Sequence, residues 1–326
     1  MNTKQSTILV MGLLVTALTF WWMDGLPLPT SAGSSTRRQP GHEFVNVVDV
    51  AKLAAGVKPD EFPCPIVRHD DRSFVVCTYR PEEDQSSTPG LLGGKIWEAD
   101  YVSKILRLLQ VNQHSLFVDV GANVGIYALP AALVGAKVIA IEASAPTVRM
   151  LARSNHVENL ADRITLLHNA LSNEHATLAL AGDVKNPSNS FLLANNSCAG
   201  LATGLLCYQT GVKTITLDDL LPLMSDSREC IIKVDIQGNE IQAFDERTAT
   251  RFIREIDVIA ILMEFSSYSS RYPDKAVDKF VEFFYRHNYS VYDPIFLKLG
   301  SNWGQWTDDI FLFKDKAKAK AKSRKS

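Results

Sequence analysis

Seven apolar runs, separated by segments of helical periodicity, dominate the last two thirds of the chain. The runs are continuous rather than alternating, which is typical of strands buried on both faces of a parallel sheet. They lie at residues 116–119, 137–141, 163–167, 229–236, 257–265, 289–292 and 309–313. Between them, residues 147–158 and 274–287 show the apolar spacing of amphipathic helices. The pattern predicts an α/β fold with a doubly wound, mostly parallel seven-stranded sheet that ends in an antiparallel pair.

Residues 115–142 are the most informative part of this pattern, because they read as strand, tight turn, helix and strand. The turn carries Gly121 and Gly125, which let the chain bend sharply and let a ligand approach where a Cβ would clash. A helix beginning near Val124 would point its unpaired N–H groups at that ligand. Each strand ends on an acidic residue, Asp119 in the first and Glu142 in the second.

Glu142 is placed to accept hydrogen bonds from ribose hydroxyls, as the acidic residue does in nucleotide-binding folds. The turn GANVG, which includes Asn123, lacks the three-glycine pattern of dinucleotide sites. An acid at the head of the turn suits a ligand with an ammonium group and no phosphate, and S-adenosylmethionine (SAM) is such a ligand. The alternative is an ordinary αβ-sandwich turn that happens to contain two glycines. Together with the turn, Glu142 favours a nucleotide-type site.

The residues after the third predicted strand, His168 and Asn169, are the next candidates. In this fold the residues just past that strand line the adenine site, so Asn169 is expected to contact the base. His168 is either a catalytic base or, as is more common for a lone histidine at a strand end, a structural hydrogen-bonding group. The long polar segment 181–211 is expected to be a loop on the substrate side, because such loops often act as lids.

The chain contains five motifs in order, FVDVGANVGIY, VIAIEASAPT, NALS, TITLDDLL and IIKVDIQGNEI. Their order and spacing resemble those of FkbM-type methyltransferases, a branch of the class I SAM-dependent enzymes with a Rossmann-like fold. The resemblance covers roughly residues 96–313 and implies SAM as the cofactor. It also implies methyl transfer to a hydroxyl, often on a sugar or a polyketide. The predicted cofactor-binding residues are Asp119, Gly121, Asn123, Gly125, Glu142, Asn169 and Asp235.

Asp235, Glu240 and Glu264 are the predicted catalytic residues. They lie near the ends of two predicted strands, beyond which ligands bind in doubly wound sheets. Asp235 would orient the SAM amino group or act as a base on an acceptor hydroxyl. The resembling proteins usually have D-x-E-G-x-E here, whereas this chain has Gln237 in place of the first glutamate, which puts activity in doubt if that glutamate is a base or a metal ligand. No metal is expected, because carboxylates at these positions also occur in metal-free transferases.

Five segments are expected along the chain. Residues 1–24 form a signal anchor or transmembrane segment, because residues 8–23 carry no charge and a Trp pair follows at the membrane-interface position. The other segments are a stalk (25–42), an N-terminal accessory region (43–95), the methyltransferase domain (96–313) and a disordered basic tail (314–326). The anchor predicts a single-pass type II membrane protein of the secretory pathway, with its catalytic region in the Golgi or ER lumen. Cleavage near Ala32 would instead give a secreted protein.

The five cysteines are compatible with an oxidising compartment. Cys230 lies at the start of a predicted buried strand and is expected to be a free core thiol. Sequons at Asn195 and Asn288 are compatible with a lumenal location. Two pairs are close enough in sequence to close short loops, namely Cys64 with Cys77 and Cys198 with Cys207.

The charge distribution bears on the partners. The net charge of −2 over 326 residues argues against a nucleic-acid-binding protein. Residues 314–326 carry seven Lys or Arg and one Asp, which leaves a net charge of −8 on the rest of the chain. This tail either contacts acidic glycans or lipid headgroups, or is simply a solvated basic segment.

The sequence therefore predicts a SAM-dependent O-methyltransferase that acts on a small-molecule or glycan acceptor, with a glycan or glycolipid of the secretory lumen favoured. The alternative is a catalytically inactive membrane protein of the same fold that serves as a lumenal binding or trafficking module. Gln237 is the main argument for the alternative, whereas the intact GANVG turn and Glu142 argue against it. An NAD-dependent oxidoreductase is disfavoured by the missing third glycine.

Overall fold

The structure is a computed structural model, and it describes residues 43–58, 60–224, 227–265 and 272–315. The predicted signal anchor, the stalk and residues 316–326 of the basic tail lie outside these residues. Within the described part of the chain, no helix combines the length and apolar composition that crossing a membrane requires.

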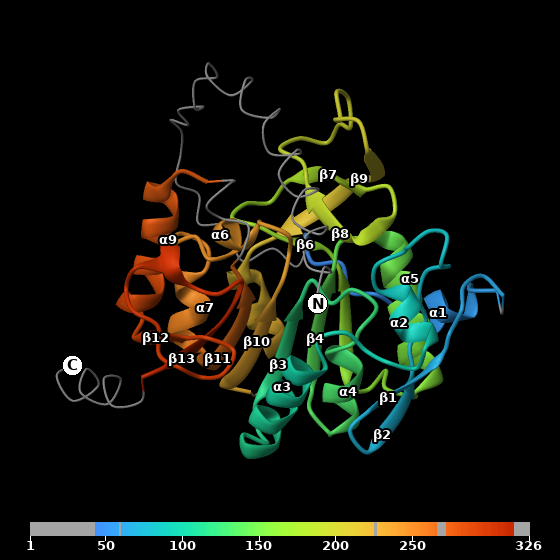
Figure 1. The fold of residues 1–326 in the computed structure, drawn as a ribbon, viewed down its shortest axis with the longest axis horizontal. Helices are drawn as coiled ribbons and strands as arrows, with labels where there is room; N and C mark the ends of the chain where they lie inside the picture. Colours follow the sequence, from blue (N-terminus) through green and yellow to red (C-terminus); the bar gives the residue numbers. More distant parts are fainter. Residues whose placement is uncertain (1–42, 59, 225–226, 266–271, 316–326) are drawn as a thin grey trace, which may run out of the picture. The chain divides into compact units, whose positions relative to one another are not determined.

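The described chain contains both helices and strands (Figure 1). The α-helices are α1 (Val50–Ala55), α2 (Thr88–Leu92), α3 (Ala99–Val111), α4 (Ala128–Leu133), α5 (Ala145–Val157), α6 (Glu240–Ala243), α7 (Thr250–Glu255) and α9 (Asp274–Arg286), and the 3₁₀ helices are η1 (Leu217–Met224) and η2 (Trp303–Gln305). The strands are β1 (Ile66–His69), β2 (Arg72–Val75), β3 (Leu116–Val120), β4 (Val138–Glu142), β5 (Ile164–His168), β6 (Ala170–Leu171), β7 (Thr177–Asp183), β8 (Asn186–Leu192), β9 (Leu205–Ile215), β10 (Glu229–Val234), β11 (Asp257–Glu264), β12 (Tyr289–Tyr292) and β13 (Asp309–Lys314).

Seven strands form the central sheet in the order β12-β13-β11-β10-β3-β4-β5. The strands from β11 to β5 are parallel, whereas β13 runs antiparallel to both β11 and β12. This arrangement confirms the predicted doubly wound, mostly parallel seven-stranded sheet and its closing antiparallel pair. In the register of β3 and β10, Asp119 lies beside Lys233, so two charged residues face each other near the carboxyl edge of the sheet.

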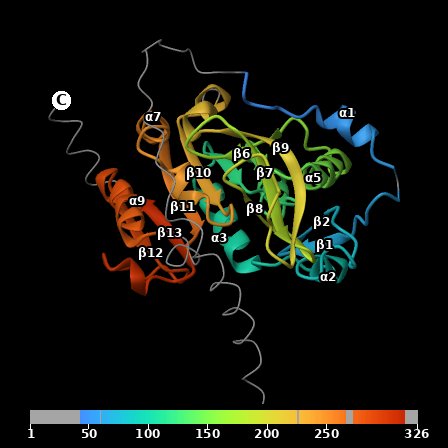
Figure 2. The same cartoon turned by 90° about the horizontal axis from the view of Figure 1, so that it is seen from above.

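Alternate residues of the central strands enter two hydrophobic cores, one on each face of the sheet. Phe117 and Ile231 pack in the core that contains α3, α4 and α5. Val118 and Ile232 pack in the other core, with α7 and α9. Figure 2 shows α9 beside β12 and β13 at one edge of the sheet and α5 towards the other. Because both faces are covered, the central strands are continuous apolar runs in the sequence.

The helix after the glycine turn begins later than the sequence predicted. α4 starts at Ala128, four residues after Val124, and has six residues. Residues 121–127 form consecutive turns instead, with Asn123 at φ 48° and Gly125 at φ 94°. A right-handed helix cannot pass through residues at positive φ, so α4 forms only beyond Gly125.

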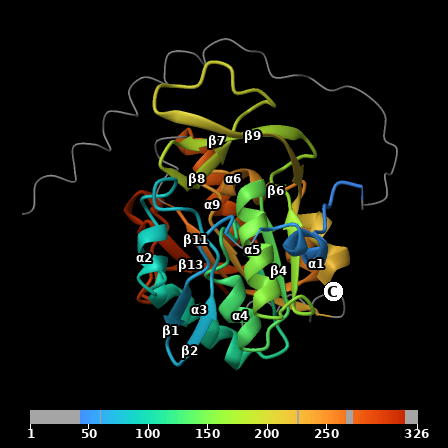
Figure 3. The ribbon, with the colours of Figure 1, turned by 90° about the vertical axis from the view of Figure 1, so that its right-hand side faces the viewer.

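The segment 181–211 was predicted as a loop, but most of it is sheet. β8 and β9 pair with β7 in antiparallel fashion, and β6 joins β9 in parallel, which gives the order β6-β9-β7-β8. In Figures 1 and 3 this second sheet lies above one end of the central strands. Its strands therefore cover the edge of the central sheet where ligands bind in doubly wound folds.

The cysteines are arranged as the sequence suggested. Cys230 is free and fully buried in β10. The antiparallel hairpin β1–β2 lies between the first two cysteines. Two disulfides are present, Cys64–Cys77 and Cys198–Cys207.

Asn169 joins three parts of the fold. Backbone hydrogen bonds fasten residues 46–48 to β5. The fully buried Asn169 side chain accepts a hydrogen bond from the Asn46 N–H at 2.7 Å and donates to the carbonyls of Phe44 at 3.0 Å and Lys213 at 3.2 Å. One amide thus connects the segment before α1, the end of β5 and the long strand β9.

We expect Asn169→Ala to lower the free energy of unfolding by about 2–4 kcal/mol, because three backbone groups lose the partner that joins them across the fold. The measurement is denaturant unfolding followed by circular dichroism. Asn302→Ala is the control, since Asn302 is exposed and makes no capping hydrogen bond at η2. Equal stability of the two variants would contradict this structural role for Asn169.

Candidate active site

A pocket lies at the carboxyl edge of the central sheet, and residues of β8 in the second sheet form part of its lining. The central sheet and its connections give it polar groups, among them those of Gly121, Asn123, Glu142, Asp235 and Gln237. The second sheet contributes Leu180, Pro187, Ser188, Ser190 and Leu192. The segment predicted to lie on the substrate side therefore does line the pocket, although as strands rather than as a loop.

At the glycine turn, other parts of the chain approach the backbone more closely than a residue with a Cβ would allow. Gly121 has φ +75°, and a Cβ at this position would lie 1.9 Å from the carbonyl oxygen of Asp235. Gly125 has φ +94°, and a Cβ there would lie 2.4 Å from a methyl group of Leu151 on α5. Both glycines are required by space as well as by backbone conformation.

Glu142, at the end of β4, supports the turn and faces the pocket. Its Oε2 accepts a hydrogen bond from the Asn123 N–H at 2.9 Å, and its Oε1 accepts one from the Ser144 N–H at 2.8 Å. Burial raises the pKa of Glu142, and these two backbone hydrogen bonds oppose the shift. Each carboxylate oxygen can accept a further hydrogen bond, so Glu142 can still bind hydroxyl groups in the pocket.

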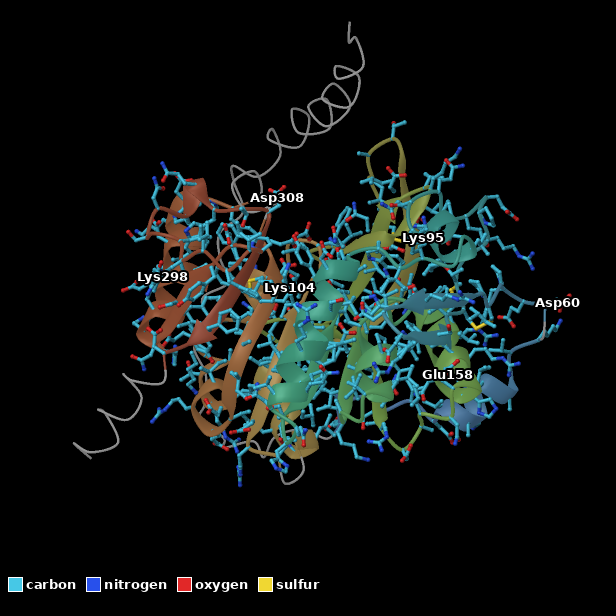
Figure 4. All side chains as sticks on the ribbon, turned by 60° about the horizontal axis from the view of Figure 1, so that its bottom comes forward. Asp60, Lys95, Lys104, Glu158, Lys298 and Asp308 are labelled. Atoms are coloured by element: carbon cyan, nitrogen blue, oxygen red, sulfur yellow. A yellow bond between two sulfur atoms is a disulfide. The ribbon has the colours of Figure 1, made fainter. Side chains whose placement is uncertain are left out.

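Asp119 and Lys233 form a buried charged layer behind the pocket wall. Asp60, Lys298 and Asp308 project outward in Figure 4, whereas Asp119 has no exposed surface and Lys233 only 5%. Neither carboxylate oxygen of Asp119 has a hydrogen-bond partner of normal geometry among the described residues. The sequence predicted direct contact between Asp119 and the cofactor, whereas the structure places Asp119 one layer deeper.

The pKa values of this layer reflect burial and mutual attraction. Burial raises the pKa of Asp119 to about 6, the charge of Lys233 opposes this shift, and the charges of Asp235 and Glu142 add to it. Burial alone would lower the pKa of Lys233, but the carboxylates of Asp235 and Asp119 reverse this effect and raise it. Lys233 is therefore a permanent cation inside the protein.

Asp235 follows β10 and is the predicted catalytic residue that reaches the pocket wall. The Lys233 ammonium lies 3.4 Å from its Oδ2. The side-chain amide of Gln237 donates to its Oδ1 at 2.7 Å. Both oxygens are thus held by neighbours while the carboxylate stays at the pocket.

The other two predicted catalytic residues lie beside Asp235 but do not line the pocket. Glu240 is fully buried, and its Oε1 accepts a hydrogen bond from the Ile236 N–H at 2.8 Å, so it shapes the turn after β10. Glu264 accepts a hydrogen bond from Gln237 at 3.3 Å. Oxygens of the three carboxylates lie within 4.8 Å of one another, which is a spacing that a metal ion can bridge.

The residues after β5 contribute less to the site than the sequence suggested. Asn169 lies at the pocket wall, but its side-chain amide is engaged by the three backbone groups described above. The His168 ring interacts with the Ala143 carbonyl at 3.2 Å and is absent from the residues that line the pocket. Burial lowers the pKa of His168. This environment favours the structural interpretation of His168.

Several pocket residues were not singled out by sequence reasoning as cofactor or catalytic residues. Gln237 and Asn239 lie within the motif IIKVDIQGNEI, and Thr147 lies at the end of VIAIEASAPT. Their motif positions were a usable signal. Ser188 and Ser190 belong to a strand that carries no such signal, because it lies within the polar segment that was predicted as a loop.

The fold and this pocket define the class. A parallel sheet with a glycine turn after its first central strand and an acid at the end of the next is the arrangement of class I SAM-dependent methyltransferases. The model of the FkbM methyltransferase domain matches residues 119–291, more than half of the chain. The chain therefore belongs to the FkbM family of SAM-dependent methyltransferases.

The chain also matches solved structures at low sequence identity and low TM-score. Precorrin-6y C5,15-methyltransferase from Geobacter metallireducens GS-15 is 12% identical, with 68% of this chain and 90% of that chain covered and a TM-score of 0.34. Magnesium protoporphyrin IX methyltransferase from Synechocystis PCC 6803, which has SAM bound, is 12% identical, with 66% and 78% covered and a TM-score of 0.34. The 16S rRNA N2 G1207 methyltransferase of T. thermophilus is 10% identical, with 78% and 51% covered and a TM-score of 0.38. No curated protein matches the chain.

The residues of the pocket fit SAM. Gly121 leaves room where a Cβ would collide with Asp235, so the turn can approach a ligand closely. Glu142 supplies acceptors suited to ribose hydroxyls, and Asp235 supplies a carboxylate suited to an ammonium group. The unpartnered carboxylate of Asp119 adds negative charge behind the wall.

We expect Gly121→Ala to abolish SAM binding and to destabilise the fold, because its Cβ would overlap the Asp235 carbonyl at positive φ. Gly200→Ala is the matched control. Gly200 has φ +78°, but no atom lies within 4 Å of the added Cβ, so it tests the backbone strain alone. Thermal unfolding and SAM titration of both variants are the measurements. If the two variants lose stability equally, close approach is not the reason for Gly121.

We expect the stability of the cofactor-free protein to fall with rising pH relative to Asp119→Asn. The pKa of Asp119 in the folded protein is raised from 3.8 to about 6. The resulting contribution of Asp119 to the free energy of unfolding is therefore fully present below pH 3.8 and is lost as the pH rises through about 6. Between pH 4 and pH 8 the parent should lose about 2 kcal/mol relative to the variant. Denaturant unfolding across this range measures it, and a pH-independent difference would contradict the buried-charge interpretation.

Proposed function

We propose that this methyltransferase transfers the methyl group of SAM to a hydroxyl group of a glycan or glycolipid in the secretory lumen. The observation that carries the proposal is Asp235, a carboxylate at the pocket wall whose two oxygens are fixed by Lys233 and Gln237. A carboxylate so placed can accept the proton of an acceptor hydroxyl.

SAM supplies, when bound, an activated methyl group on a sulfonium that is already a good leaving group. The work left to the chain is positioning and proton acceptance. Glu142 and the turn at Gly121 and Asn123 are the groups that hold the nucleoside end, and Asp235 holds the acceptor end. β8 covers the pocket and helps to exclude water from it.

The lumenal location is supported by covalent chemistry. Disulfides are typical of oxidising compartments, and the structure has two, Cys64–Cys77 and Cys198–Cys207. The sequon residue Asn195 is exposed and therefore accessible to glycosylation, whereas Asn288 is half-buried. The proposed type II anchor would hold the domain at the membrane from residues outside the described structure.

The choice of a sugar hydroxyl depends on the resemblance to related enzymes and gains nothing from the tryptophans of residues 301–306. Trp303 donates to Asp278 at 2.7 Å, Trp306 donates to the Gly300 carbonyl at 2.8 Å, and both rings pack against Phe265. These contacts favour the interpretation that the two rings fix the loop to the core.

The test is calorimetric titration of SAM into the full chain, with Asp119→Ala and Glu142→Ala beside the parent. We expect the parent to bind with a Kd in the micromolar range and both variants to bind at least tenfold more weakly, because each loses negative charge at or behind the pocket. A screen of polyhydroxyl acceptors with radiolabelled SAM follows. A folded parent that does not bind SAM would overturn the proposed function and favour the binding or trafficking module.

A further inference from the structure

The amide of Gln237 lies between two carboxylates. Its Nε2 donates to Asp235 Oδ1 at 2.7 Å and to Glu264 Oε2 at 3.3 Å. Ionised carboxylates only accept hydrogen bonds, so the amide nitrogen, and not its oxygen, must face them. One neutral group with two N–H donors thus connects two side chains of like charge.

We propose that Gln237 is a positioning residue that holds Asp235 and Glu264 together through its amide, so that Asp235 is fixed at the pocket without a divalent cation. This inference rests on the proposed function, because it concerns how Asp235 is kept in place for the cofactor and the acceptor. It assigns a role to the residue that, in the sequence, was the main argument for an inactive protein.

The backbone supports a dedicated position for this side chain. Gln237 has φ +57°, a conformation that residues other than glycine rarely adopt, and it is followed by Gly238 at φ +93°. Strained residues persist where their surroundings hold them, and they gather at functional sites. Here the strain directs the amide back towards Asp235, two residues earlier in the chain, and towards Glu264 at the end of the neighbouring strand β11.

Lys233 completes the restraint from the opposite side. Its ammonium lies 3.4 Å from Asp235 Oδ2, while Gln237 holds Oδ1. The two oxygens of Asp235 are therefore held by different residues, one charged and one neutral. A carboxylate restrained at both oxygens cannot rotate freely.

A glutamate at position 237 would change the chemistry of the cleft. It would bring a third carboxylate to within hydrogen-bonding distance of Asp235 and Glu264, and Glu240 belongs to the same group, whose oxygens lie within 4.8 Å of one another. Like charges this close must share a proton or bind a cation. The amide adds no further charge to this group and offers N–H donors to two of its carboxylates instead.

The experiment compares Gln237→Glu, Gln237→Met and the parent in the full chain, with Gln242→Glu as the control. Gln242 lies on α6 and is not among the residues that line the pocket, so Gln242→Glu adds the same negative charge outside the pocket. Mn²⁺ binding is measured by electron paramagnetic resonance, and SAM binding by calorimetry between pH 5 and pH 8. Met has nearly the length of Gln and the same backbone restriction but no donor.

We expect Gln237→Glu to bind one Mn²⁺ per chain at least tenfold more tightly than the parent and Gln242→Glu do. We expect Gln237→Met to bind SAM about tenfold to a hundredfold more weakly than the parent, the effect of removing hydrogen bonds to a charged group. Its pH of half-maximal SAM affinity should also rise, because Asp235 loses an N–H donor that favours its ionised form. A purely structural role would not move that midpoint.

Two results would overturn the inference. One is Mn²⁺ binding by the parent that is as tight as binding by Gln237→Glu. The site would then hold a cation with Gln237 in place. The other is an unchanged SAM affinity and pH midpoint in Gln237→Met. If Gln237→Glu fails to fold, the Met variant decides. If the parent does not bind SAM, the proposed function fails, whereas the Mn²⁺ comparison still tests Gln237.

Discussion

One buried ammonium group connects the parts of this active site. Lys233 donates to the Gly121 carbonyl at 2.9 Å, lies 3.4 Å from Asp235 and pairs in register with Asp119. It also lies 5.4 Å from the centre of the Tyr127 ring. Burying a lysine is unfavourable unless its charge is compensated, and here two carboxylates compensate it. The glycine turn, the end of β3 and the end of β10 therefore depend on the same cation.

The close approach at Gly121 has the same origin. The ammonium of Lys233 can reach both the Gly121 carbonyl and Asp235 because these two segments almost touch, and they almost touch because residue 121 has no Cβ. Parallel pairing of β3 with β10 places their carboxyl ends side by side. Topology, glycine and lysine thus act together, so that a change in one would disturb the geometry of the others.

The sequence predicted the central sheet well. Strands buried on both faces must be apolar throughout, so each of them gives a continuous apolar run that is easily recognised in the sequence. It failed where the signal is weak. β8 and β9 are largely half-exposed, which hides the period of two, so residues 181–211 resembled a loop. The start of α4 could not be found from periodicity, because Asn123 and Gly125 adopt positive φ for reasons of tertiary packing.

The site residues divide in the same way. Glu142 and Asp235 were predicted from strand ends, and both line the pocket. Asp119 was also predicted from a strand end, but whether a side chain reaches the pocket or stays behind its wall depends on the turn that follows. Asn169 was expected to contact the adenine base and does line the pocket, but the partners of its amide, Phe44, Asn46 and Lys213, are more than forty residues away in sequence. Long-range partners of this kind leave no local pattern.

The charge of the cleft explains the choice of ligand better than the glycine count does. Three carboxylates, Asp119, Glu142 and Asp235, lie at or behind the wall, with Lys233 as the cation among them. Burial is the main cause of the raised pKa of Asp119, and the charges of Asp235 and Glu142 add to it while Lys233 opposes it. SAM, with an ammonium and a sulfonium against one carboxylate, has a net positive charge and reduces the excess of carboxylate charge. The pyrophosphate of a dinucleotide would add to it, so the same pocket that attracts SAM repels NAD.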